Sequence, residues 1–191
     1  MLMTSTPHPF VLPRESCALV VVDYQEKLAR TLDDEVRADT VRGVQILMRA
    51  ADRLGIPVLI TEQYPAGLGA TLPELAELAP EAPRFEKVAF DCCGADGFVD
   101  RLGELGADHI VLVGMETHIC VLQTALSLAQ AGRRVWVARD AVCSRQRANW
   151  EAGLALMERA GAVVAPVETL LFMWLGRSGT PEFKELSALI K

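Results

Sequence analysis

Three reactive side chains stand in or near three separate apolar runs, and together they could supply a nucleophile and its proton acceptor. Asp23 follows a short β-branched run, Lys87 interrupts an otherwise apolar stretch, and Cys120 stands where a helix is predicted to begin. A helix N-terminus favours the thiolate, so Cys120 is a candidate nucleophile and Asp23 a candidate general base. Each residue also has a structural interpretation: a small core residue for Cys120, a helix N-cap for Asp23, and a solvent-directed ammonium for Lys87.

The remaining thiols and histidines are weaker candidates. Four further cysteines are most simply structural, although the adjacent pair among them is also a candidate redox pair: Cys17, Cys92, Cys93 and Cys143. His118 stands two residues before Cys120, and side chains at that spacing on a helix point in different directions, which disfavours a Cys–His pair. Five cysteines without a CxxC motif indicate neither a disulfide framework nor a zinc site.

Motifs for other chemistries are missing from the sequence. No GxGxxG or Walker-type glycine loop follows the first apolar run, so nucleotide-phosphate binding there has no support. The nucleophile elbow GxSxG is also absent. The three histidines, His8, His109 and His118, do not stand at metal-ligand spacing. We therefore expect an enzyme that needs neither a metal nor a cofactor.

Composition favours one folded domain. The 191 residues are 51% hydrophobic and 23% charged, which allows a sizeable core and excludes disorder as the main state. Nineteen Lys and Arg against 25 Asp and Glu give a net charge of −6, which opposes binding to nucleic acid. No apolar stretch reaches about 20 residues, and the N-terminus does not resemble a signal peptide. We therefore expect a cytoplasmic protein without a membrane span.

Short apolar runs alternate with stretches of helical periodicity. Six strands are predicted, at residues 18–22, 56–61, 84–90, 109–114, 134–140 and 162–167. Amphipathic helices lie between them, the longest over 36–54, and several end at a glycine that suits a C-terminal cap. This alternation predicts the α/β class, with a doubly wound parallel sheet and helices on both faces in three layers. Ligands bind such a sheet at the carboxyl ends of its strands, where Asp23, Lys87 and Cys120 stand.

The chain ends and one long loop are the segments outside this alternation. A single domain is predicted over 1–191, with a flexible leader over 1–13 and a tail over 177–191 that docks on the body or on another subunit. The Pro- and Gly-rich stretch 62–83 is a candidate lid, because a loop of that length is usually functional. The apolar segment 170–175 is either core or a surface for a partner chain.

Several motifs around the reactive side chains form one pattern. They are Val20–Asp23 at the end of the first strand, Lys87, and Gly114–Val121, which contains a glycine, two variable residues, a threonine, two more residues and a cysteine. This pattern resembles the isochorismatase-like cysteine hydrolase superfamily over nearly the whole chain. Within it, Thr61–Pro65 is similar to the isochorismatase domain-containing proteins. The resemblance implies a six-stranded parallel sheet in the order 3-2-1-4-5-6.

The resemblance also implies a catalytic triad of Asp23, Lys87 and Cys120. In such a triad the aspartate takes the thiol proton and the lysine supports the charge of that pair. The thiolate then attacks an amide-like carbonyl to form an acyl-enzyme that water hydrolyses. A cis peptide bond between Met115 and Glu116 is implied as well, with the N–H groups of Glu116 and Cys120 forming an oxyanion hole. Members of the superfamily tend to form dimers or larger assemblies, so a homo-oligomer is expected.

Departures from the family pattern limit the substrate. The segment Glu62–Pro65 holds no histidine, which disfavours the metal-assisted hydrolysis of nicotinamide. The presence of Cys120 disfavours the vinyl ether reaction of true isochorismatases, which lack this nucleophile. Asp91 adds a carboxylate that would alter the pairing of Lys87 if it faced inward. The predicted substrate pocket consists of Tyr24, Gln63, Tyr64, Phe90 and Thr117.

The predicted function is hydrolysis of a small amide, imide or related carbonyl compound by a metal-independent cysteine hydrolase. A noncatalytic binding or scaffold protein that keeps the ancestral pocket is the second hypothesis. A thiol redox protein that uses Cys120 with Cys92 or Cys93 is the third. The intact set of Asp23, Lys87 and Cys120 favours the first hypothesis, because a buried charge pair is costly to keep without a function.

Overall fold

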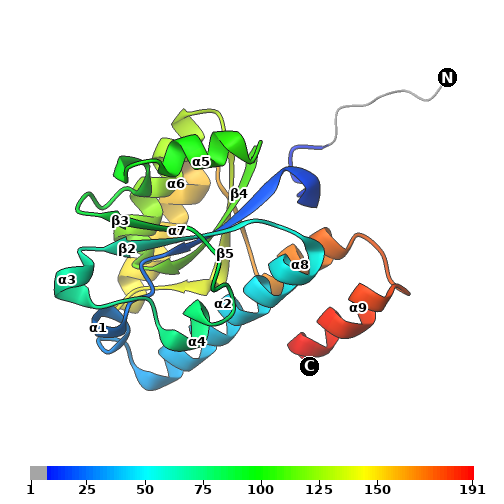
Figure 1. The fold of residues 1–191 in the computed structure, drawn as a ribbon, viewed down its shortest axis with the longest axis horizontal. Coiled ribbons are helices and arrows are strands. Elements are labelled where there is room, and N and C mark those ends of the chain that lie inside the picture. Colours follow the sequence, from blue (N-terminus) through cyan, green and yellow to red (C-terminus); the bar gives the residue numbers. More distant parts are fainter. Residues whose placement is uncertain (1–7) are drawn as a thin grey trace.

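Six parallel strands form the centre of the protein (Figure 1). The structure is a computed structural model, in which residues 8–191 are described. The strands lie side by side in the order β3-β2-β1-β4-β5-β6. Their bounds are β1 Cys17–Val22, β2 Val58–Gln63, β3 Arg84–Lys87, β4 His109–Met115, β5 Arg134–Cys143 and β6 Val163–Ala165. The predicted doubly wound α/β fold and its strand order are confirmed.

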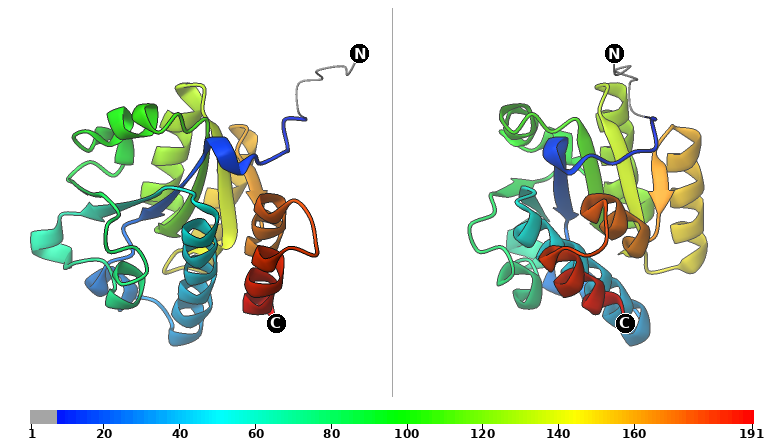
Figure 2. Two further views of the ribbon diagram at one scale, coloured as in Figure 1. Left: turned by 45° about the vertical axis from the view of Figure 1, so that its right-hand side comes forward. Right: turned by 90° about the vertical axis from the view of Figure 1, so that its right-hand side faces the viewer.

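Helices cover both faces of the sheet, as Figures 1 and 2 show. Helices α2 (Asp34–Leu54) and α8 (Val167–Leu175) lie on one face, and α5 (Phe98–Glu104), α6 (Leu122–Gln130) and α7 (Arg147–Arg159) lie on the other. The shorter helical segments are η1 Arg14–Ser16, α1 Glu26–Ala29, α3 Pro65–Leu68, α4 Pro73–Ala76, η2 Cys92–Gly94, η3 Thr117–Val121, α9 Pro181–Leu186 and η4 Ser187–Ile190.

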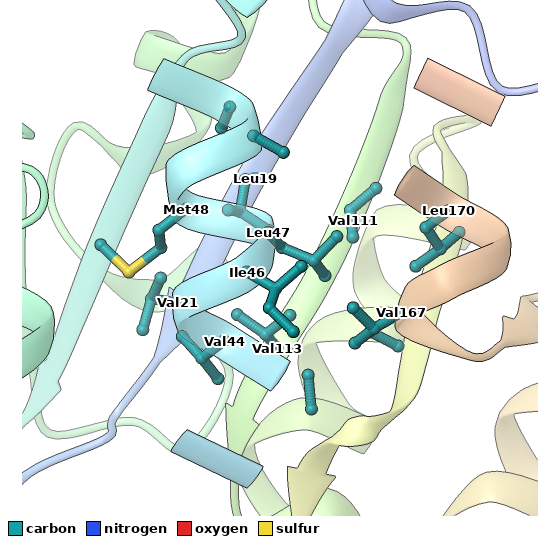
Figure 3. Close-up of a cluster of buried hydrophobic side chains, with 14 of the residues drawn as sticks. Leu19, Val21, Val44, Ile46, Leu47, Met48, Val111, Val113, Val167 and Leu170 are labelled. Carbon is teal, nitrogen blue, oxygen red and sulfur yellow. The ribbon is translucent and has the colours of Figure 1, made fainter. Parts of the chain in front are cut away.

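Strand β1 illustrates why the strands appear as continuous apolar runs. All six of its residues are buried. Leu19 and Val21 join the core under α2 and α8, whereas Val20 and Val22 join the core under α5, α6 and α7. Figure 3 shows Leu19 and Val21 beside Leu47 and other side chains of α2. A central parallel strand is buried on both faces, so every position selects an apolar residue.

Both ends of the described chain pack on the body of the protein. Residues 1–7 lie outside the described residues, but Leu12 is buried in the core, so the predicted leader 1–13 is anchored at this point. In the tail, α9 packs on α2 (Figure 2), where Leu186 is buried and Arg53 pairs with two glutamates of α9. Ion pairs this exposed contribute little to stability, so the burial of Leu186 provides most of the free energy that holds α9 on α2.

Strand ends at the carboxyl edge differ from the predicted ones. β2 continues to Gln63, past the predicted end at residue 61, and β3 ends at Lys87, before the predicted end at residue 90. β3 ends early because the next residues turn around the Lys87 ammonium. Its Nζ donates to the carbonyl oxygens of Ala89 and Phe90 at 3.2 and 3.0 Å.

The segment predicted to be an irregular lid contains two short helices and is tied to the sheet. Gln25 Nε2 donates to the carbonyl oxygens of Gln63 and Gly69 at 3.0 and 2.6 Å. Glu62 Oε1 accepts from the N–H and the hydroxyl of Thr71 at 2.7 and 2.6 Å. The first half of the segment is therefore anchored by buried polar side chains of β2 and the loop after β1. Within residues 8–191, no helix combines the length and the apolar character that crossing a membrane requires.

Gly114 allows β4 to approach β1 closely, and a substitution there should be severely destabilising. Its φ is 111°, and a Cβ atom would lie 2.1 Å from the carbonyl oxygen of Val22. We expect Gly114→Ala to lower the free energy of unfolding by at least about 3 kcal/mol, because the backbone angle and the lack of space both exclude a side chain. Urea unfolding measures the change.

The matched control for this substitution is Gly103→Ala in α5. A Cβ atom at Gly103 meets nothing within 4 Å, and its backbone angle is ordinary for a helix. Alanine there should raise stability by about 0.5–1 kcal/mol through helix propensity. Similar unfolding curves for the two variants would contradict the argument about Gly114.

Candidate active site

Asp23, Lys87 and Cys120 meet at the carboxyl edge of the sheet. Asp23 directly follows β1, Lys87 ends β3, and β4 leads through Glu116 into the turn that carries Cys120. Lys87 Nζ lies 2.7 Å from Asp23 Oδ2, and both side chains are completely buried. Cys120 is 6% exposed, and its thiol lies within the electrostatic influence of both charged groups. The three predicted residues thus form one cluster built from three strands.

Lys87 keeps its charge inside the protein. In addition to Asp23, its Nζ donates to Gln63 Oε1 at 2.8 Å and to the carbonyl oxygens of Ala89 and Phe90. Because an ammonium has three protons, these acceptors use all of its donors. Burial by itself lowers the pKa of Lys87, but the charge of Asp23 and its hydrogen bond raise it above its usual value. The interpretation of Lys87 as a solvent-directed side chain is therefore wrong.

The Asp23 carboxylate is held from two sides. Its Oδ1 accepts from Thr61 Oγ1 at 2.8 Å and its Oδ2 accepts from Lys87. Asp23 has a φ of 46°, a left-handed conformation that is rare outside glycine and often marks functional sites. Gln25, and not Asp23, precedes helix α1 as its N-cap residue. The sequence alone did not identify Thr61 as a site residue. Thr61 reaches the site because it lies opposite Val22 where β1 and β2 pair.

Cys120 lies in a π-helical turn, η3, that leads into α6. Burial raises the pKa of its thiol well above the usual value, and the charge of Asp23 raises it further, whereas Lys87 lowers it. This corrects the expectation of a thiolate stabilised by the helix start. Desolvation and the neighbouring carboxylate both disfavour the thiolate. The resting group is a thiol that needs a proton acceptor, and the carboxylate beside it can be one.

Glu116 connects the turn to the loop that follows β5. The peptide bond between Met115 and Glu116 is cis, the geometry that the resemblance implies. The Glu116 N–H donates to no acceptor within residues 8–191. Arg145 donates to the Glu116 carboxylate through Nε and Nη2 at 2.9 and 3.1 Å. His118 Nδ1 lies 2.9 Å from Ser144 Oγ on the same loop, so the imidazole is engaged away from Cys120.

Four of the predicted pocket residues lie at this edge of the sheet. Gln63 belongs to the cluster through its hydrogen bond with Lys87. Tyr64 and Phe90 are 57% and 53% exposed at the adjoining surface. Thr117 is completely buried, and its hydroxyl has no hydrogen-bond partner among the described residues.

The placement of Tyr24 in the pocket is wrong. Its ring is completely buried in the core under α2, on the face of the sheet opposite to the core that contains Cys120. Its hydroxyl donates to the carbonyl oxygen of Arg37 at 3.5 Å. The regular alternation of β1 ends at Asp23, whose φ of 46° is left-handed, and the residue that follows it is directed into the opposite core.

Asp91 faces away from the buried ammonium, so the extra carboxylate does not alter its pairing. Its Oδ1 accepts from the Cys93 N–H at 2.8 Å and its Oδ2 accepts from Ser127 of α6, which makes it the cap of the η2 turn. Cys92 does lie beside the cluster, because its completely buried Sγ is 3.5 Å from Thr61 Oγ1.

The cluster combines a thiol, a carboxylate and an ammonium. Among residues 8–191, no group of three or more His, Cys, Asp or Glu side chains is arranged to hold a metal ion. The three groups can act as nucleophile, proton acceptor and fixed positive charge, which suits attack on a carbonyl carbon.

Comparisons with known protein sequences identify close relatives. A family model described as the isochorismatase domain matches residues 17–169. The secreted isochorismatase effector Isc1 of Phytophthora sojae is 35% identical over 182 residues, which cover 92% of this chain and 85% of that protein. Isochorismatase domain-containing protein 2 of Xenopus laevis is 33% identical, and the match covers 94% of this chain and 85% of that protein.

Solved structures share the fold. One described as the MAR1 ribonuclease of Caenorhabditis elegans has a TM-score of 0.87 and 37% sequence identity, and the match covers 94% of this chain and 91% of that chain. The YcaC protein of Escherichia coli, described as an octameric hydrolase of unknown specificity, has a TM-score of 0.87 and 21% identity over 97% and 92% of the two chains. At that identity the second similarity concerns the fold alone.

Proposed function

The chain belongs to the isochorismatase family, and we propose that it is a cysteine hydrolase whose catalytic residues are Asp23, Lys87 and Cys120. The observation that carries the proposal is the completely buried Asp23–Lys87 pair, with its 2.7 Å contact, beside the thiol. Removing two charges from water costs several kcal/mol each, and apolar residues of similar volume are often more stable in such a place. The proposed substrate is a small amide, imide or related carbonyl compound.

In the proposed reaction, Asp23 accepts the thiol proton as the sulfur of Cys120 bonds to the carbonyl carbon of the substrate. The C–N bond then breaks, the leaving nitrogen takes the proton from Asp23, and a thioester remains on Cys120. Water attacks the thioester as it gives a proton to Asp23, the acid product leaves, and the proton returns to the sulfur. Lys87 stays charged throughout and holds the carboxylate in place.

The oxygen that becomes negative during both attacks needs hydrogen-bond donors. We assign this role to the backbone N–H groups of Glu116 and Cys120. The Glu116 N–H supports the assignment because it has no acceptor within residues 8–191. The ion pair with Arg145 fixes Glu116, so the donor needs no reorganisation when the charge forms.

The alternative functions gain little support from the site. RNA hydrolysis, which the name of one structural relative suggests, needs a basic surface for phosphate groups, whereas this chain carries a net charge of −6. A scaffold protein has no use for a buried ion pair that costs stability. A redox protein requires a reversible disulfide between Cys120 and Cys92 or Cys93, and mild oxidation followed by peptide mass spectrometry tests for one.

The proposed partners are a small-molecule substrate and further copies of this chain. We propose a cytoplasmic location, because reduced thiols are maintained there and all five cysteines are free. The relative Isc1 is described as secreted, so location differs within the family. The homo-oligomer is proposed from the resemblance to the superfamily, whose members tend to form dimers or larger assemblies. Light scattering of the purified chain at micromolar concentration tests this assembly.

Asp23→Asn should separate the reactivity of the thiol from turnover. Asp23 raises the pKa of Cys120 and Lys87 lowers it, so removal of the carboxylate charge should lower the pKa of the thiol. We expect alkylation of Cys120 by iodoacetamide at neutral pH to become faster, by about tenfold for each unit of pKa. Amide hydrolysis should fall strongly because the proton acceptor is lost. Peptide mass spectrometry across a pH series measures the first effect.

Asp91→Asn is the control for this experiment, because it removes a carboxylate that faces away from the cluster. This variant should alkylate at Cys120 and turn over substrate as the native chain does. Slower alkylation of Cys120 in Asp23→Asn would contradict the argument, since it would mean that the carboxylate favours the thiolate in the resting protein.

A further inference from the structure

We infer that the substrate presents an uncharged acyl group to the thiol and carries an apolar substituent that lies on a rim formed by Tyr64, Val88 and Phe90. The inference rests on the proposed function, because it names the class of compound that the same thiol attacks. It follows from two independent features of the described residues. The nearby cations are already paired with carboxylates, and apolar side chains are exposed next to the cluster.

The two cations closest to the catalytic cluster, Lys87 and Arg145, are each ion-paired with a buried carboxylate. Lys87 uses all of its donors on Asp23 and three neutral oxygens. Arg145 donates two hydrogen bonds to the buried Glu116 carboxylate. Lys27 is exposed and donates to the neutral carbonyl oxygen of Gly67 at 2.6 Å, so it is not one of these ion-paired cations. A substrate carboxylate beside the thiol would meet the Asp23 carboxylate and lose water without gaining a free cation, which is unfavourable.

The rim residues are presented by the backbone that surrounds the ammonium. Tyr64, Val88 and Phe90 are 57%, 82% and 53% exposed. The Tyr64 N–H donates to the carbonyl oxygen of Lys87 at 2.8 Å, and the Val88 carbonyl oxygen accepts from Gln63 Nε2 at 2.9 Å. The Phe90 carbonyl oxygen accepts from Lys87 Nζ at 3.0 Å. The backbone of each of these three residues is therefore bound to Lys87 or Gln63, which places the exposed side chains at the border of the cluster.

Tyr64 is held in a fixed position. Its φ of 38° is left-handed, and besides Asp23 it is the one non-glycine residue with a positive φ in the described part of the chain. A Cβ atom on Gly67 would lie 2.3 Å from Tyr64 Cε1, so the ring lies directly on the bare backbone of α3. An exposed aromatic ring with a strained backbone and a glycine beneath it is preorganised for contact with a flat or apolar group.

Three alkylating probes with the same reacting carbon test the inference on the full chain. Iodoacetamide is neutral, iodoacetate carries a carboxylate, and iodoacetanilide is neutral with a phenyl ring. In each case the sulfur displaces iodide, and peptide mass spectrometry reads the rate at Cys120, with glutathione as the reference thiol. We divide each alkylation rate of Cys120 by the rate of glutathione with the same probe. This relative rate should be at least about tenfold higher for iodoacetamide than for iodoacetate. Iodoacetanilide should be favoured over iodoacetamide by about tenfold.

Variants locate the preference on the rim. Tyr64→Ala should remove most of the gain for iodoacetanilide, and so should Gly67→Ala, which displaces the ring without changing it. Leu156→Ala is the matched control, because Leu156 is 49% exposed on α7 and should leave all three ratios unchanged. Circular dichroism and light scattering confirm that fold and assembly are the same in the four proteins.

Two results would overturn the inference while the proposed function stands. One is a Cys120 that reacts with iodoacetate as readily as with iodoacetamide, which would show that a free cation serves the site. The other is a change in molecular mass in Tyr64→Ala, which would assign the rim to contact with a second copy. A Cys120 inert to all three probes, while the half-buried Cys93 reacts, would overturn the proposed function and the inference together.

Discussion

Cys120→Ala is expected to lower kcat/KM for amide hydrolysis by about 10⁴-fold or more, because the covalent route loses its nucleophile. The free energy of unfolding should change by less than about 1.5 kcal/mol, since the substitution removes one small group from a site that is 6% exposed. Turnover of a panel of small amides and imides measures the first effect, and urea unfolding measures the second. The two readouts together separate lost chemistry from lost structure.

Cys143→Ala is the matched control. Burial raises the pKa of Cys143 to about 12, so it is also a buried, protonated thiol, but it lies in the core on the other face of the sheet, beside Tyr24. This variant should keep native turnover at a similar cost in stability. A folded Cys120→Ala protein with native turnover would show that the thiol is not the nucleophile, and the scaffold hypothesis would then be the stronger one.

The positions of the catalytic candidates are predictable from sequence for a physical reason. A strand buried on both faces appears as an uninterrupted apolar run, so a reactive residue at or just after such a run marks the carboxyl edge of the sheet. Asp23 stands out in this way after β1, whereas Lys87 stands out as a charge within an apolar stretch and Cys120 as a thiol at a predicted helix start. The strand order has no such local signal, because it depends on which strands pair across the chain. The resemblance to a known superfamily implied it, and the structure confirms it.

Properties that depend on the surroundings of a residue are not predictable in the same way. The helix start at Cys120 indicated a thiolate, whereas burial and Asp23 raise the pKa of the thiol. Tyr24 is a pocket candidate from sequence because it follows Asp23, but its side chain faces the opposite core. Thr61 carries no chemical motif and enters the site through strand register alone. Each of these outcomes is decided by distances across the fold.

Lys87→Met is expected to have the largest effect on stability within the cluster. It leaves the Asp23 carboxylate completely buried with the Thr61 hydroxyl as its remaining side-chain partner. Breaking a buried pair in this way costs about 3–5 kcal/mol. Asp23→Asn should cost less, because the ammonium keeps Gln63 and two backbone carbonyls as acceptors. Both variants should lose turnover. Urea unfolding followed by tryptophan fluorescence measures the stabilities.

The double variant Asp23→Asn/Lys87→Met removes both charges together. Its free energy of unfolding should exceed that of Lys87→Met by at least about 2 kcal/mol, because the unpaired buried charge is gone, while turnover stays absent. The exposed pair Arg147–Glu151 is the control cycle, where a coupling of only about 0.3–0.5 kcal/mol is expected. Strictly additive losses at Asp23 and Lys87 would contradict the pairing. Stability that returns without activity would mean that folding does not need the buried pair, which leaves the chemistry beside Cys120 as the reason for its presence.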